Sequence, residues 1–348
     1  MGPGATPRDN LRLLLGICYK DAVVLIIWTN SSRGPLMADS LRQLRRAVIQ
    51  GAIRQALTAT GVLPIGAQRP VIRSLVTLAG SIPMLRGKVR ENMCKALGDG
   101  VPAQAENLYF RRLGWLFSSS LSAFHYGITS TAIPEEIQFD ESVRVLDDAV
   151  SGRCGVVIAA PHWFGHELVA AMINRRHPLA MLVREAETSE RMARKLKWYN
   201  ALGVEIALRP SRAASIRSAV RYLDLLKRGK VLAITPDLLA EPGSGVETCL
   251  FGRSARLHGG AFALAIAAKA PMIRCYGRWQ ADSLVVAFER APIALDHHER
   301  DAAIRAALQD WCKWFEAKLR ENPENWLFWL DKRWSQFLRA TPRASGCK

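Results

Sequence analysis

The chain has 348 residues, 49% of them hydrophobic, and its formal net charge is +17 at pH 7. This length and composition suffice for one large domain with a sizeable core. The seven cysteines contain no C-x-x-C pair, which argues against a zinc site or a disulfide framework and favours a reducing, cytosolic-side location.

The basic charge is concentrated early in the chain, where residues 1–130 hold 16 Lys and Arg against 6 Asp and Glu. Such a basic surface favours an anionic partner. No zinc-finger, leucine-zipper or RNA-binding signature accompanies it, so no nucleic acid is expected. Anionic lipid headgroups or an acidic protein fit better, and an arginine-rich composition that only serves solubility is the alternative.

The first apolar stretch runs from Leu11 to Trp28, with Lys20 and Asp21 in its middle. Neither half approaches the ~20 apolar residues that a membrane span needs. No small-residue cleavage site follows at the position that a signal peptide requires. We therefore expect neither a span nor a signal peptide here.

Two amphipathic helices are predicted next, at Ser40–Thr58 and Val71–Leu85, with arginines on one side and aliphatic residues on the other. Basic amphipathic helices bind at lipid interfaces, or they pack against their own domain; both alternatives are open. A helix rich in Leu, Phe and Trp follows at Ala105–His125. We divide the chain into a basic amphipathic segment, residues 1–70, and a main domain, residues 71–340.

From Gly155 onward, strands and helices alternate, which is typical of an α/β layer. The predicted fold is α/β, a single domain with a mixed, mostly parallel central sheet flanked by helices, plus the N-terminal amphipathic helices. The predicted strands are the apolar run from Gly155 that ends on Pro161, Leu179–Val183, Val204–Leu208, Val231–Ile234, Met272–Tyr276 and Ser283–Phe288, and the predicted helices are Thr188–Leu202, Ala213–Lys227 and Gly259–Lys269.

The first of these strands ends at Pro161 and is followed by His162 and, five residues later, by Glu167. If His162 lies in a turn and Glu167 on the following helix, the carboxylate can hold one ring nitrogen while the other takes a proton from a nucleophile. The alternative is a strand-end histidine and a first-turn glutamate that the helix dipole favours. A zinc motif is disfavoured because Ala170 stands where a second histidine is required.

Two further polar residues follow strands at the edge where open α/β sheets place their sites. Arg184 is predicted to bind a phosphate or to stabilise an oxyanion, and Asp237 is predicted to orient a hydroxyl group. The alternatives are a surface cation beside Glu185 and a turn aspartate after Pro236.

Several motifs in register resemble the late acyltransferases of lipid A biosynthesis, within the lysophospholipid acyltransferase superfamily. The resemblance covers residues 70–335. It rests on the H-x4-E motif from His162 to Glu167, Arg86–Asn92, Val183–Arg184, Thr235–Asp237, Leu250–Gly252 and Asn322–Trp329.

The resemblance implies an enzyme that moves a fatty acyl group from acyl carrier protein or coenzyme A to a hydroxyl of a lipid or glycolipid. His162 and Glu167 would be catalytic, Arg184 and Asp237 would bind substrate, and neither a metal nor a further cofactor is implied. The enzyme would be peripheral on the cytoplasmic face of the inner membrane.

Two departures from the family keep other functions open. The usual N-terminal membrane helix is not recognised, and Leu238–Glu241 replaces the usual aspartates and aromatic residue. A phosphatidylinositol mannoside or a soluble secondary metabolite is therefore an alternative acceptor. A non-catalytic, basic membrane-binding protein is the second alternative, although such a protein has no need of the pair His162 and Glu167.

Overall fold

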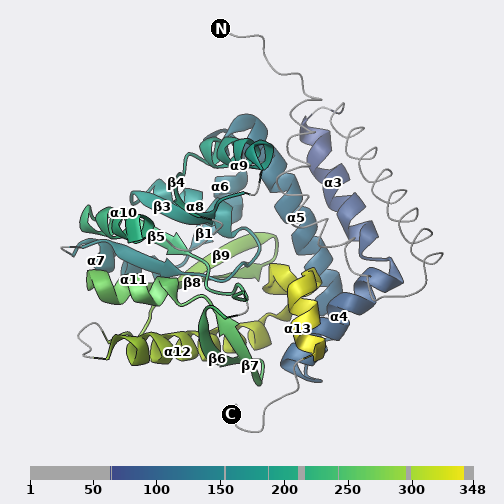
Figure 1. The fold of residues 1–348 in the computed structure, drawn as a ribbon. Helices are drawn as coiled ribbons and strands as arrows, with labels where there is room; N and C mark the ends of the chain where they lie inside the picture. Colours follow the sequence, from purple (N-terminus) through teal and green to yellow (C-terminus); the bar gives the residue numbers. More distant parts are fainter. Residues whose placement is uncertain are drawn as a thin grey trace.

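The computed structural model describes residues 63, 65–152, 154–186, 188–210, 216–241, 243–294 and 299–340. The helix predicted at Ser40–Thr58 and the apolar stretch at Leu11–Trp28 lie outside these residues. The described chain is an α/β protein whose seven-stranded sheet is flanked by helices (Figure 1). The predicted fold class is confirmed.

The sheet has the strand order β1-β9-β8-β2-β5-β3-β4, and a separate two-stranded sheet consists of β6 and β7. The strands are β1 (Ile137–Phe139), β2 (Val156–Ala159), β3 (Leu179–Arg184), β4 (Glu205–Arg209), β5 (Val231–Ile234), β6 (Val246–Leu250), β7 (Arg253–Leu257), β8 (Met272–Gln280) and β9 (Ser283–Arg290). The helices are α3 (Ile65–Ala79), α4 (Pro83–Leu97), α5 (Ala105–Tyr126), α6 (Ile133–Glu136), α7 (Val143–Val150), α8 (His166–Asn174), α9 (Ser189–Leu202), α10 (Ile216–Lys227), α11 (Gly260–Ala268), α12 (Arg300–Glu321) and α13 (Lys332–Ala340). Three 3₁₀ turns complete the chain, η1 (Ile128–Ser130), η2 (Pro323–Asn325) and η3 (Leu327–Leu330).

The central strands β8, β2, β5, β3 and β4 are all parallel to one another, and within the described seven-stranded sheet only the pair β8 and β9 is antiparallel. All four residues of β2 are buried, as expected of a parallel strand covered on both faces. Because these strands run in the same direction, their carboxyl ends meet at one edge of the sheet.

The prediction of one continuous helix at Val71–Leu85 is wrong, because the chain forms two helices there, α3 and α4, that meet at residues 80–82. Pro83 begins α4, and Ile82 before it is extended (φ −71°, ψ 113°). A residue before proline avoids the helical region, whereas proline fits the first position of a helix. Helix α3 also runs across residue 70, the boundary expected from the sequence.

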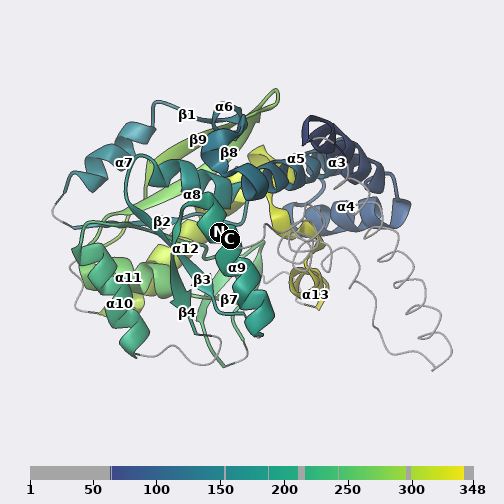
Figure 2. The same cartoon turned by 90° about the horizontal axis from the view of Figure 1, so that it is seen from above.

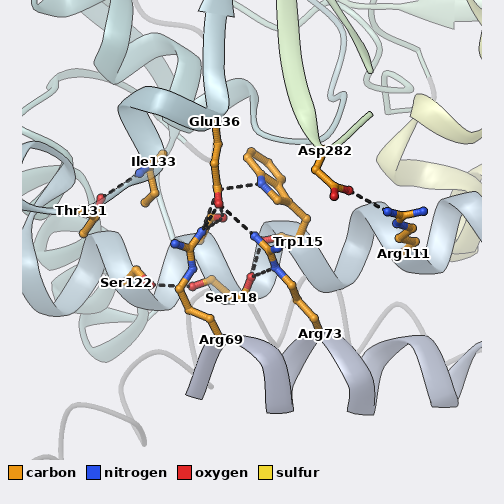
Figure 3. A network of polar contacts seen from close by, with 11 residues as sticks. Arg69, Arg73, Arg111, Trp115, Ser118, Ser122, Thr131, Ile133, Glu136 and Asp282 are labelled. Atoms are coloured by element: carbon orange, nitrogen blue, oxygen red, sulfur yellow. Dashed lines mark hydrogen bonds and ion pairs between the residues drawn. The ribbon is translucent and has the colours of Figure 1, made fainter. Parts of the chain in front are cut away.

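An ion-pair network fixes α3 against the rest of the domain (Figure 3). The carboxylate of Glu136 on α6 accepts hydrogen bonds from Arg69 (2.7 Å) and Arg73 (3.2 Å) on α3, and from the indole N–H of Trp115 (2.9 Å) on α5. Single ion pairs at a surface contribute about 0–1 kcal/mol, but a shared carboxylate fixes several side chains together. Figures 1 and 2 show α3, α4, α5 and α13 gathered on one side of the sheet. None of the helices within the described ranges is long and apolar enough to cross a bilayer.

The hairpin of β6 and β7 turns at Phe251 and Gly252, both with positive φ (57° and 67°). Two residues with φ above zero form a tight hairpin turn, but a phenylalanine is rare in this region. The Phe251 amide donates to the carboxylate of Glu316 (2.5 Å), and its ring is 1% exposed. The ring lies among those of Phe315, Trp326, Trp329 and Trp334. Burial in this aromatic cluster therefore offsets the strain of the turn.

Candidate functional site

The register of the sheet brings His162 and Asp237 together. Ala159 at the end of β2 lies beside Ile234 at the end of β5. Each strand end is followed by one residue, a proline and then the polar residue, Ala-Pro-His on one strand and Thr-Pro-Asp on the other. Equal spacing from a register pair on parallel strands places the two side chains next to each other.

The imidazole of His162 is held by the carboxylate of Asp237. Its Nδ1 lies 2.6 Å from one carboxylate oxygen of Asp237, and its backbone N–H donates to the other oxygen (2.8 Å). The indole N–H of Trp326 also donates to that second oxygen (2.8 Å). Asp237 is completely buried, and protein donors occupy both of its carboxylate oxygens.

The Asp237 carboxylate is ionised despite its burial. Burial raises the pKa of Asp237, but the nearby His162 and the hydrogen bonds from His162 and Trp326 outweigh it and hold the pKa below its usual value. An ionised carboxylate only accepts, so Nδ1 of His162 carries its proton. Nε2 has no hydrogen-bond partner among the described residues, and the side chain is 17% exposed. Nε2 is therefore positioned to accept a proton from a bound molecule.

The turn that presents His162 is shaped by Gly165, which has φ +84° and precedes α8. A Cβ atom there would lie 3.0 Å from the ring of Trp115, so a side chain meets both backbone strain and crowding. On the other side of the turn, the ring of Trp163 fills the space above Gly277, where a Cβ atom would come within 2.2 Å of it.

The C-terminal segment completes the site. The amide of Leu327 donates to the carbonyl of His162 (2.9 Å), and Trp163 forms a β-bridge with Trp326. The ring of Phe328 lies 4.5 Å from the imidazole, measured between centroids. The site therefore combines segments that are 75 and 89 residues apart in the chain.

Glu167 is not the partner of His162 Nδ1, contrary to the expectation from the sequence. It lies in the first turn of α8, and its carboxylate accepts hydrogen bonds from the Trp198 indole (2.8 Å) and the Tyr199 hydroxyl on α9. The geometry differs because the H-x4-E spacing directs Glu167 towards α9, whereas a neighbouring strand supplies a closer carboxylate. Whether Glu167 takes part in catalysis stays a prediction.

His166 is a second histidine beside the site. Its ring lies 5.0 Å from that of His162, and its Nδ1 is 3.1 Å from the Trp163 carbonyl. Burial, followed by the proximity of His162, lowers the pKa of His166. This histidine is therefore neutral near pH 7 and adds no charge to the site.

Arg184 is the last residue of β3, and its side chain is exposed. Strand β3 pairs with β5, so Arg184 lies one strand away from Asp237. Three of the four predicted site residues, His162, Arg184 and Asp237, thus lie at the carboxyl edge of neighbouring strands.

Residues 38–336 match the model of the family of bacterial lipid A biosynthesis acyltransferases. The chain belongs to this family. A search of curated proteins finds no match. Members transfer acyl groups other than aminoacyl groups, their acceptors are lipid A precursors, and they are membrane-associated, so this chain is an acyltransferase.

Two motifs of the acyltransferase have structural roles that sequence reasoning missed. The amide of Asn92, at the end of the Arg86–Asn92 motif, donates to the Trp329 carbonyl (2.6 Å) and the Ser335 hydroxyl (2.9 Å). Trp326, within the Asn322–Trp329 motif, is fully buried, and its indole N–H also holds Asp237. The repeated x-Pro spacing before His162 and Asp237 was the one signal in the sequence for their pairing.

Proposed function

We propose that this acyltransferase moves a fatty acyl group from the thioester of acyl carrier protein or coenzyme A to a hydroxyl of a lipid A precursor or related glycolipid. His162 acts as the general base. The observation that carries this proposal is the buried, ionised Asp237 on Nδ1, which leaves Nε2 of His162 free to take a proton.

The proposed reaction has two steps, addition to the thioester and release of the thiol. Nε2 of His162 accepts the proton of the acceptor hydroxyl while the hydroxyl oxygen forms a bond to the thioester carbonyl carbon. The carbon–sulfur bond then breaks, and the imidazolium returns the proton to the leaving thiolate. The negative charge of Asp237 stabilises the imidazolium between the two steps. Arg184 is proposed to stabilise the anionic oxygen of the intermediate or to bind substrate.

A transfer assay with the purified acyltransferase, acyl carrier protein thioesters and a lipid A precursor tests the proposal. We expect wild-type transfer and a loss of about 10²–10⁴-fold in rate for His162→Ala, since general-base catalysis contributes a factor of this size. His177→Ala is the matched control, because His177 contacts Asp147 away from the site. A fully active His162→Ala variant would refute the mechanism. Transfer to a phosphatidylinositol mannoside or to a soluble metabolite, but not to a lipid A precursor, would contradict the proposed acceptor and leave the proposed mechanism unchanged.

The location is proposed to be peripheral, on the cytoplasmic face of the inner membrane. Around the junction of α3 and α4 the side chains of Leu75, Leu78, Ile82 and Met84 are exposed, Leu78 to 66%. Residues 65–90 contain five Lys and Arg and no Asp or Glu. Exposed aliphatic side chains within a basic stretch match a surface of anionic lipids.

Vesicle binding is expected to have both an ionic and an apolar component. The protein should bind phosphatidylglycerol vesicles, and binding should weaken as salt rises, since the Debye length falls from about 10 Å at 0.1 M to about 3 Å at 1 M. The double variant Leu78→Ser/Ile82→Ser should bind more weakly at every salt concentration, whereas Val220→Ser on α10 is the exposed aliphatic control. Equal binding by both variants would assign lipid contact to another surface.

A further inference from the structure

Two arginines lie side by side at the carboxyl edge of the sheet. Arg184 and Arg209 are register partners on the parallel strands β3 and β4, so both side chains leave the same face of the sheet. Arg184 is exposed and Arg209 is partly buried. In the part of the chain that the structure describes, neither guanidinium has an ion-pair or hydrogen-bond partner.

A histidine completes this group of cations. His258 directly follows β7, and the bridge between Leu239 and Leu257 places it beside the loop that leaves Asp237. Among the described residues, the charges of Arg209, Arg184 and Arg333 act on His258, and that of Glu241 opposes them. His258 is partly buried, and Arg209 and Arg184 are close enough for their charges to act on its ring.

The unbalanced positive charge has measurable consequences in the free protein. Burial, then Arg209 and Arg184, lower the pKa of His258 to about 4. Burial and then Arg184 also lower the pKa of Arg209. Placing like charges together in a partly buried position costs free energy unless an anion is bound there. Such a perturbed group beside a reaction centre is a candidate for a binding site.

We propose that Arg184, Arg209 and His258 bind a phosphate ester carried by one of the two substrates, at the ends of β3 and β4, which lie two and three strands away from the strand that precedes His162. Two guanidinium groups offer paired N–H donors that match the oxygens of a phosphate dianion. The phosphate comes either from the phosphopantetheine arm of the thioester donor or from the lipid acceptor. This site rests on the proposed acyl transfer and adds the feature by which a substrate is recognised.

Matched substrates with and without the phosphate test the site and identify its source. The wild-type enzyme should prefer either acyl-phosphopantetheine over acyl-pantetheine, or the phosphorylated over the dephosphorylated acceptor, in kcat/KM. Arg209→Gln should reduce this preference by about 10- to 100-fold, mainly through KM, because a charged hydrogen bond to the phosphate is lost. Arg209→Lys should keep part of the preference, and Arg228→Gln, an exposed arginine paired with Asp224, is the matched control.

The outcome separates this site from the proposed function. An active enzyme whose preference is the same in Arg209→Gln and wild type for both substrate pairs would overturn the phosphate site alone. An inactive wild-type enzyme would instead contradict the proposed transfer. A measurement on the wild-type protein covers the case in which Arg209→Gln does not fold. Inorganic phosphate should shift the NMR signal of the His258 ring, identified with His258→Gln, and an unchanged signal would overturn the site.

Discussion

Asp237→Asn is expected to lower the rate of acyl transfer by about 10⁴-fold while leaving the fold intact. The asparagine amide can donate to Nδ1 of His162, which forces the ring proton onto Nε2 and removes the base. The same substitution in the histidine–aspartate pair of a serine protease lowers kcat by about 10⁴ for this reason. Nearly equal volumes of the two side chains keep the packing around Trp326 unchanged.

Glu167→Gln decides between the two carboxylates near the site. Since Glu167 bonds to Trp198 and Tyr199 rather than to His162, its amide should retain most contacts, and the rate should fall by less than about 10-fold. Single-turnover rates with the same donor and acceptor provide the comparison, and circular dichroism checks the fold. If Glu167→Gln were the more damaging change and Asp237→Asn nearly neutral, the base would depend on Glu167, as the H-x4-E motif predicts.

Phe251→Ala should destabilise the protein by about 3–5 kcal/mol, the usual cost of removing a buried phenylalanine ring. The ring is fully enclosed by four aromatic neighbours, so the cavity cannot collapse easily. Phe251→Gly relieves the positive φ of the turn but loses the same ring. Phe251→Gly should therefore destabilise the protein less than Phe251→Ala does, and the difference should equal the relieved backbone strain, about 1 kcal/mol.

Urea unfolding measures this loss, with Phe337→Ala as the control. Phe337 is only partly buried, and its ring packs edge-on against that of Trp334, so its removal should cost clearly less. A destabilisation of less than about 1 kcal/mol for Phe251→Ala would mean that the hairpin tip is not anchored by its ring.

The parts of the fold that follow local rules were predictable from the sequence. The apolar run of β5 and the helix α9, which Thr188 caps at its start and Gly203 at its end, lie where the pattern placed them. The junction of α3 and α4 was missed because the apolar periodicity continues through Pro83. The hairpin of β6 and β7 was missed because its turn carries Phe251 where a glycine or asparagine is the usual signal.

In the site, the sequence identified the residues better than their partners. His162, Arg184 and Asp237 were placed at strand ends, and they do lie at one edge of the sheet. The partner of His162 was assigned to Glu167, because a motif reports only short-range spacing. The pairing with Asp237 depends on the register of β2 and β5, which are far apart in the sequence, and a single sequence does not contain that register.

The dependence of the site on Trp326 and Leu327 has a consequence for the folding chain. Contacts between segments far apart in sequence form late, since the closure entropy of long loops must be overcome first. Until residues 326–328 dock, Asp237 lacks its indole donor, and the turn at His162 lacks its backbone partner. A partly folded chain therefore holds no oriented base, so it should not hydrolyse acyl thioesters before the C-terminal segment has docked.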